Sequence, residues 1–172
     1  MNSTGFINTI LSRKEDKGYQ ANLKRGVSKG TEHYAYPLVA KFCDLAKETE
    51  AKAFITVGAF MAASKCHHTT NIGNFGASLK ALALSRNGTP GSGCPTDSRA
   101  SRILRCRNSK EVLEAIKASL HMISSGNVYV NYTRLIDDII NWSPEIARLW
   151  AKGYYTSNLE VANRYQTNSE EV

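Results

Sequence analysis

The sequence of 172 residues lacks the features that mark several large classes of protein. Its longest apolar run, residues 53–63, is far shorter than the roughly 20 residues of a membrane-spanning helix. The N-terminal residues hold no basic segment leading into an apolar stretch, so we expect no secretory signal and a cytoplasmic protein. The sequence also contains no phosphate-binding glycine loop, dinucleotide fingerprint, nucleophile elbow or metalloprotease motif. We therefore predict neither a membrane protein nor an enzyme.

The four cysteines lack the C-x-x-C spacing that is typical of zinc and redox sites. Cys66, His67 and His68 could form a metal site together with Cys94 or Cys106. Ligand pairs in structural zinc sites usually lie roughly two to five residues apart, whereas adjacent residues of a helix point about 100° apart. Because this spacing chelates poorly, we predict four reduced thiols and no metal or other cofactor.

Basic residues, in contrast, are in excess. The 22 Lys and Arg residues outnumber the 15 Asp and Glu residues, which gives a formal net charge of +7. Such an excess is typical of proteins that bind an anionic partner, most often nucleic acid, although it does not identify a fold. The hydrophobic share of 42% predicts a folded chain.

Apolar residues recur at helical spacing along most of the chain, which predicts an all-α fold. The clearest helix begins after Asn108, which forms a capping-box pattern with Glu111, and ends before Gly126. Ser143 followed by Pro144 predicts the start of another helix. We expect further helices over residues 6–14, 19–25, 37–47, 50–66, 75–85, 98–106 and 132–140, of which 50–66 is buried nearly all round. Only residues 128–130 are expected to be extended.

A Gly/Pro-rich segment, residues 87–97, divides the predicted helices into two groups. Its composition is typical of turns, so we expect an exposed and mobile loop. The loop is either a domain boundary or a surface segment that orders on a partner. We predict a smaller N-terminal helical part at residues 1–86 and a C-terminal helical bundle at residues 98–158. Residues 159–172 are expected to form a tail that frays toward its acidic end.

The basic residues are best organised on the helix predicted after this loop, which Asp97 or Ser98 would cap. At about 100° per residue, Arg99, Arg102 and Arg105 fall on one side of the helix and apolar residues on the other. No acid four residues away neutralises these arginines, and guanidinium groups pair well with phosphate oxygens. We therefore interpret this side as a phosphate-binding surface rather than a solvated helix face.

Other basic residues extend the positive surface. Three of them, Arg107, Lys110 and Lys117, follow the same helix. A second cluster comprises Arg13, Lys14, Lys17, Lys24, Arg25 and Lys29, and Lys80 and Arg86 could join it. No aromatic residues are interleaved with these cations as in an RNA-binding sheet, so contact with the nucleic-acid backbone is favoured over base reading.

Several short motifs occur in an order that matches one known family. They are Leu23-Lys-Arg-Gly26, the segment 74–82, Arg102-Ile-Leu-Arg-Cys-Arg-Asn108, Tyr132-x-x-Leu-Ile-Asp-Asp-Ile-Ile-x-Trp142 and Trp150-Ala-Lys-Gly-Tyr-Tyr155. Over about residues 17–156 the chain resembles the CasB-type small subunit of Cascade, the type I-E CRISPR surveillance complex. The resemblance implies an all-helical fold and a role in antiviral defence without catalysis, since a separate nuclease cleaves the target.

The resemblance also implies partners and binding residues. Two copies of this subunit usually lie head to tail among the other Cascade subunits, where they hold the guide RNA with the target DNA and give the displaced strand a basic path. The nucleic-acid-facing positions correspond to Lys24, Arg25, Lys80, Arg99, Arg102 and Arg105, followed by Arg107, Lys110, Arg148 and Lys152.

The chain departs from the family pattern in three places. Lys24 stands where Arg is usual, which removes the planar fork needed for bidentate contact. The segment around Lys80 is one residue short, which could displace its ammonium, and the loop before Asp97 is longer than the family needs.

Two other functions stay open. A free-standing DNA-binding regulator would use the Arg99–Arg105 helix in a major groove and prefer one duplex sequence. A pure assembly protein would instead bind an acidic protein and ignore nucleic acid.

Overall fold

The computed structural model describes residues 1–28, 30–64, 69–125 and 128–156, and over these residues the chain forms nine α-helices and no strand. The helices are α1 (Ser3–Ser12), α2 (Lys17–Arg25), α3 (Tyr36–Val39), α4 (Glu48–Ala63), α5 (Phe75–Ser85), α6 (Pro95–Leu104), α7 (Ser109–Ser124), α8 (Tyr132–Ile140) and α9 (Pro144–Tyr155), with a short 3₁₀-helix at Glu32–Tyr34. The predicted all-α fold is confirmed. The segment expected to be extended makes one isolated bridge, between Val130 and Thr69.

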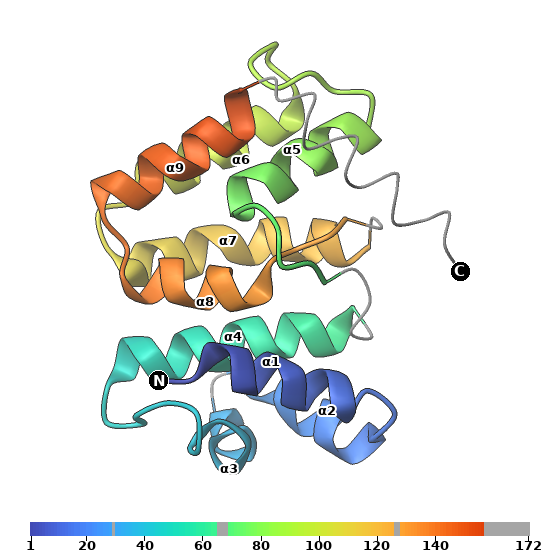
Figure 1. The fold of residues 1–172 in the computed structure, drawn as a ribbon, viewed down its shortest axis with the longest axis vertical. Helices are drawn as coiled ribbons and strands as arrows, with labels where there is room; N and C mark the ends of the chain where they lie inside the picture. The colour runs from blue at the N-terminus through green and yellow to red at the C-terminus, as the bar shows by residue number, and fades with distance from the viewer. Residues whose placement is uncertain (29, 65–68, 126–127, 157–172) are drawn as a thin grey trace.

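The helices form three tiers along the longest axis of the molecule (Figure 1). The first four helices make one outer tier, α7 and α8 lie in the middle, and α5, α6 and α9 make the other outer tier. Among the described residues, no helix is long and apolar enough to span a membrane.

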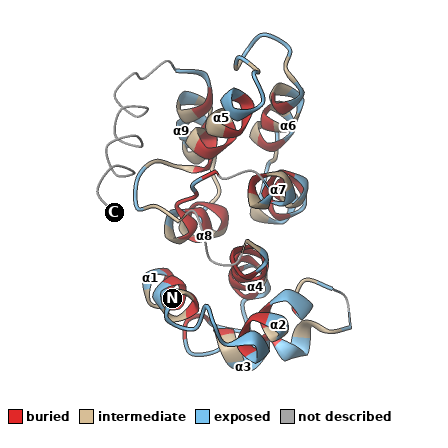
Figure 2. Cartoon of the chain, turned by 90° about the vertical axis from the view of Figure 1, so that its right-hand side faces the viewer, coloured by how far each residue is buried: buried red, intermediate tan, exposed pale blue. Residues whose placement is uncertain are grey.

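Helix α4 connects the N-terminal tier to the middle tier. It is buried on nearly all sides, as the sequence predicted, and packs against α1, α2, α7 and α8 (Figure 2). The N-terminal and C-terminal helices therefore share one hydrophobic core. Helix α5, which the sequence grouped with residues 1–86, packs against α6, α7 and α9 instead. The division at residues 87–97 stays a prediction.

Side-chain caps explain where most helices begin. The Asn108 side chain accepts a hydrogen bond from the Glu111 N–H at 3.0 Å, and Glu111 accepts one from the Arg107 N–H at 2.8 Å. Ser143 accepts a hydrogen bond from the Ile146 N–H at the start of α9. Both predicted N-caps are thus confirmed. The predicted stop at Gly126 lies outside the described residues.

Three predicted boundaries are wrong. The helix expected over residues 6–14 begins at Ser3 and ends at Ser12. The helix expected over residues 37–47 ends at Val39, and the chain continues in turns, in which Asp44 accepts a hydrogen bond from the Ala46 N–H. The basic helix α6 begins at Pro95, with Cys94 as its N-cap, rather than after Asp97 or Ser98.

Candidate nucleic-acid interface

Helix α6 has the two-sided character that its sequence predicted. Ala100 and Ile103 are each 1% exposed and pack into the core, whereas Arg102 and Arg105 are exposed to solvent. Arg107, in the turn between α6 and α7, is exposed as well. Within the described part of the chain, none of these three arginines takes part in an ion pair. Their charge is therefore available to an external anion.

Arg99 differs from the other arginines of α6. Its side chain is half-buried, and its Nε atom has no hydrogen-bond partner among the described residues. A guanidinium that is partly removed from water needs an acceptor more than an exposed one does. Of the three arginines predicted to share one face, Arg102 and Arg105 are thus exposed, and Arg99 is partly enclosed.

The start of α6 is held by Asp97, whose carboxylate lies three residues after the N-cap. It accepts hydrogen bonds from the N–H groups of Gly91 and Gly93, each at 2.8 Å, and of Cys94 at 3.0 Å. The Tyr154 hydroxyl of α9 donates to the same carboxylate at 2.7 Å. These donors, with the Gly91 N–H contributing most, lower the pKa of Asp97. The loop before α6 is thus folded around a carboxylate of the helix that carries the arginines.

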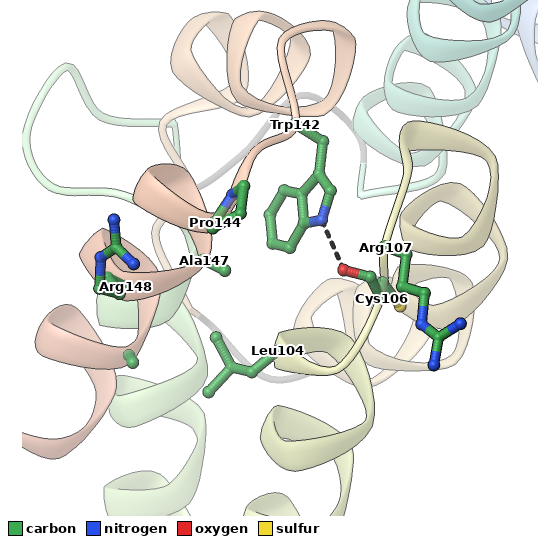
Figure 3. A pocket seen from close by; sticks show the side chains of 8 residues that line it. Leu104, Cys106, Arg107, Trp142, Pro144, Ala147 and Arg148 are labelled. Carbon is green, nitrogen blue, oxygen red and sulfur yellow. Dashed lines mark hydrogen bonds between the residues drawn. The ribbon is translucent and has the colours of Figure 1, made fainter.

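The turn after α6 faces the first half of α9 across an open cavity of about 480 Å³ (Figure 3). Its lining is mostly apolar and is flanked by two cations. The lining residues are Leu104, Cys106, Arg107, Trp142, Pro144, Ala147, Arg148 and Ala151, which we call the Trp142 groove. None of the apolar lining residues was predicted as part of a site.

Hydrogen bonds and aromatic contacts fix the wall of the Trp142 groove. Trp142 Nε1 donates to the Cys106 carbonyl oxygen at 2.9 Å, which ties the segment before α9 to the turn after α6. The Trp142 ring meets Trp150 edge to face, with centroids 4.9 Å apart. Trp150 Nε1 donates to the buried Asp138 carboxylate at 2.6 Å, and burial raises the pKa of Asp138. The aromatic wall is therefore held in place from α8.

Helix α9 adds Arg148 and Lys152 to this part of the surface. Both side chains are exposed, and Arg148 pairs with Glu145 at 3.0 Å. Because both members of that pair are about 70% exposed, the pair contributes little to stability and leaves guanidinium donors free. The structure thus brings together α6, the α6–α7 turn and α9, and places Arg107 and Arg148 at one cavity, while Arg102, Arg105 and Lys152 are exposed on the same elements or at their ends.

The remaining predicted site residues lie elsewhere. Lys110 is exposed in the first turn of α7, and its charge helps to lower the pKa of Glu48 after the larger effect of Lys52. Lys80 is half-buried on α5, and its ammonium donates to the carbonyl oxygen of Thr156 at 2.5 Å. One of the three N–H donors of Lys80 is therefore engaged at the end of α9, which leaves two for an external acceptor.

Lys24 and Arg25 occupy the last turn of α2, in the opposite outer tier from α6 (Figure 1). Both are exposed, and the Arg25 guanidinium lies 5.1 Å from the centroid of the Tyr34 ring. They form a second basic area, separate from the one on α6 and α9.

The residues considered for a metal site are only partly described. Cys66, His67 and His68 lie outside the described residues, while Cys94 and Cys106 are free thiols. Among the described residues, no group of three His, Cys, Asp or Glu side chains could hold a metal ion.

Comparison with protein-family models matches residues 20–155 to the model for CRISPR-associated protein Cse2. Comparison with curated proteins gives no match.

Solved structures with the same fold cover nearly the whole chain. A chain of a CRISPR RNA-guided surveillance complex is 22% identical, with a TM-score of 0.70 over 95% of this chain and 96% of that one. A Cse2-family CRISPR-associated protein from Thermus thermophilus is 19% identical, with a TM-score of 0.67 over 87% of this chain and 93% of that one. A structure of CasB, also from Thermus thermophilus, is 20% identical, with a TM-score of 0.66 over 90% of this chain and 98% of that one. The family match over residues 20–155 and the shared fold confirm the resemblance found in the sequence: the chain belongs to the CRISPR-associated Cse2 family.

Proposed function

We propose that this chain is a non-catalytic, nucleic-acid-binding subunit of a cytoplasmic CRISPR RNA-guided surveillance complex that acts in antiviral defence. Its membership of the Cse2 family supports this role, as does its fold, which is shared with a chain of such a complex. Its partners are the guide RNA, the target DNA, the other subunits of the complex and a second copy of itself.

One observation carries the nucleic-acid part of this proposal. Arg102, Arg105 and Arg107 project into solvent from a helix and turn whose other side is packed, and no acid among the described residues pairs with them. Exposed guanidinium groups in a row suit phosphate oxygens, which occur in every sequence. Such a surface binds strands regardless of base order, as a subunit does when a guide RNA reads the target by pairing.

The phosphate-binding surface comprises the five cations of α6, the α6–α7 turn and α9: Arg102, Arg105, Arg107, Arg148 and Lys152. Arg99, Lys110, Lys80, Lys24 and Arg25 complete the proposed set, with Lys24 and Arg25 as a second contact area. If about five phosphates are neutralised, the logarithm of the binding constant should fall with the logarithm of salt concentration with a slope of roughly −3.5 on single strands.

Two measurements test the proposal. The tagged chain, purified gently from its native host, should bring down short RNAs that share a constant handle around variable inserts. The isolated chain should bind unrelated single strands with equal affinity and with the steep salt dependence given above. If the tagged chain brings down only bulk cellular RNA, and the isolated chain clearly prefers one duplex sequence, the protein is a regulator instead. A slope near zero would contradict phosphate binding.

A further inference from the structure

The Trp142 groove has a property that phosphate binding alone does not use. Between its two cations the lining is mostly apolar: Leu104, Pro144 and Ala147 line the cavity together with Trp142 (Figure 3). Its volume of about 480 Å³ lies within the range of sites that bind small organic groups. Backbone phosphates are not expected to enter an apolar cavity, because burying their charge there would be unfavourable.

The surroundings of the groove favour an occupant that is flat, apolar on its faces and attached to negative charge. Arg107 and Arg148 flank the cavity from opposite sides, and their guanidinium groups lie outside the apolar lining (Figure 3). A nucleotide in a single strand has this form, with an aromatic base between two phosphates. Bases of every kind stack on aromatic side chains, so such a contact tolerates any sequence.

We propose that the Trp142 groove binds one unpaired nucleobase of a single strand against Trp142, while the flanking phosphates contact Arg107 and Arg148. This inference rests on the proposed nucleic-acid function and adds a base contact to it. The Trp142 ring suits this role because its Nε1 already donates to the Cys106 carbonyl and its ring already packs against Trp150, so little side-chain freedom is lost on binding.

The test compares two single-stranded ligands with the same number of phosphates, each about 12 units long. One is oligothymidylate, and the other is an abasic strand of the same length. The unmodified full-length chain should bind oligothymidylate about 5- to 150-fold more tightly than the abasic strand, the factor expected for one stacked base.

A substitution that fills the groove without changing charge locates the effect. Ala147 lines the cavity, so Ala147→Leu should reduce the affinity for oligothymidylate to that for the abasic strand and leave the latter unchanged. Ala118→Leu, at an exposed position of α7, is the matched control and should keep the preference for bases. Circular dichroism checks that both variants are folded.

The outcomes separate the base contact from the phosphate contacts. Equal binding of both strands by the unmodified chain, or a base preference that survives Ala147→Leu, would overturn the groove proposal while the phosphate-binding function stands. If the unmodified chain binds neither strand, the proposed function itself is overturned. A peptide with one phenylalanine between aspartates serves as a second probe. If Ala147→Leu weakens only this peptide, the groove is a docking site for protein and not for a base.

Discussion

Replacing Arg102, Arg105 and Arg107 together with Ala should weaken single-strand binding most strongly at low salt. All three side chains are exposed and lack an acidic partner within the described residues, so each can neutralise one phosphate. Each such contact contributes about −0.7 to the salt slope on a single strand. Losing three should therefore flatten the slope by about two.

The difference in affinity between the unmodified chain and the triple variant should then decrease as the salt concentration rises. Over an about fourfold rise in salt, from about 50 to 200 mM, the ratio of the unmodified affinity to the variant affinity should shrink about 20-fold. Fluorescence anisotropy of a labelled strand of mixed sequence, measured at four or more salt concentrations, gives both slopes. Because exposed side chains change stability by only about 0.5 kcal/mol each, the thermal unfolding of the variant should stay close to normal.

A matched control separates the arginine surface from the overall charge. Lys47, Lys52 and Lys117 each pair with a glutamate, and replacing them with Ala lowers the formal net charge of +7 by the same three charges. This control should retain the original slope. If it flattens the slope as much as the arginine variant does, total charge governs binding and the argument from unpaired arginines is wrong.

Three further predictions concern the framework beneath this surface. Gly76→Ala would place a Cβ atom 1.9 Å from the Trp150 carbonyl oxygen, so it should destabilise the fold by about 2–3 kcal/mol in urea unfolding, whereas Gly18→Ala, which has room, should not. Burial raises the pKa of Asp138 in the folded state, so protonation of Asp138 stabilises the fold in acid, and this stabilisation is lost as the pH rises through that pKa. The stability of Asp138→Asn relative to the unmodified chain should therefore increase from acid to neutral pH. A difference in stability that stays constant with pH would refute this account. Asp97→Ala removes the acceptor of three backbone N–H groups and of Tyr154, so the amides of residues 91–94 should exchange hydrogen faster, and unchanged exchange would contradict the anchoring role.

Much of the fold could be predicted because local signals and long-range packing agree. The Asn108 and Ser143 caps and the buried character of α4 follow from residue types at fixed spacing. The start of α6 was missed because Asp97 fits an N-cap and a third helical position equally well in sequence. Only the Pro95 start and the backward hydrogen bonds of Asp97 to Gly91 and Gly93 distinguish the two.

The candidate site could be predicted only in part. The exposed arginines of α6 follow from helical periodicity, because the packing of Ala100 and Ile103 decides which side faces solvent. The Trp142 groove has no comparable signal, since its two walls are far apart in sequence and meet only where α6 packs on α9. The engagement of Lys80 by the Thr156 carbonyl was equally hidden, because it depends on where the end of α9 lies beside α5.

The arrangement of charge on the surface explains why the net charge alone says little about binding. The cations near α4 and α7 are largely matched by glutamates, as Lys52 is by Glu48 and Lys117 by Glu114. The cations of α6 and the following turn have no such partners among the described residues. The unpaired positive charge that attracts a phosphate is therefore concentrated at α6 and the turn after it.

This local surface and the Trp142 groove would respond differently to the form of the nucleic acid. A duplex presents the same phosphates to Arg102 and Arg105 as a single strand does, but its bases are stacked inside and cannot reach the groove without being unpaired. A single strand can satisfy both the arginines and the groove. The combination would therefore favour unpaired strands over duplexes without reading their sequence, a selectivity that exposed arginines alone do not provide.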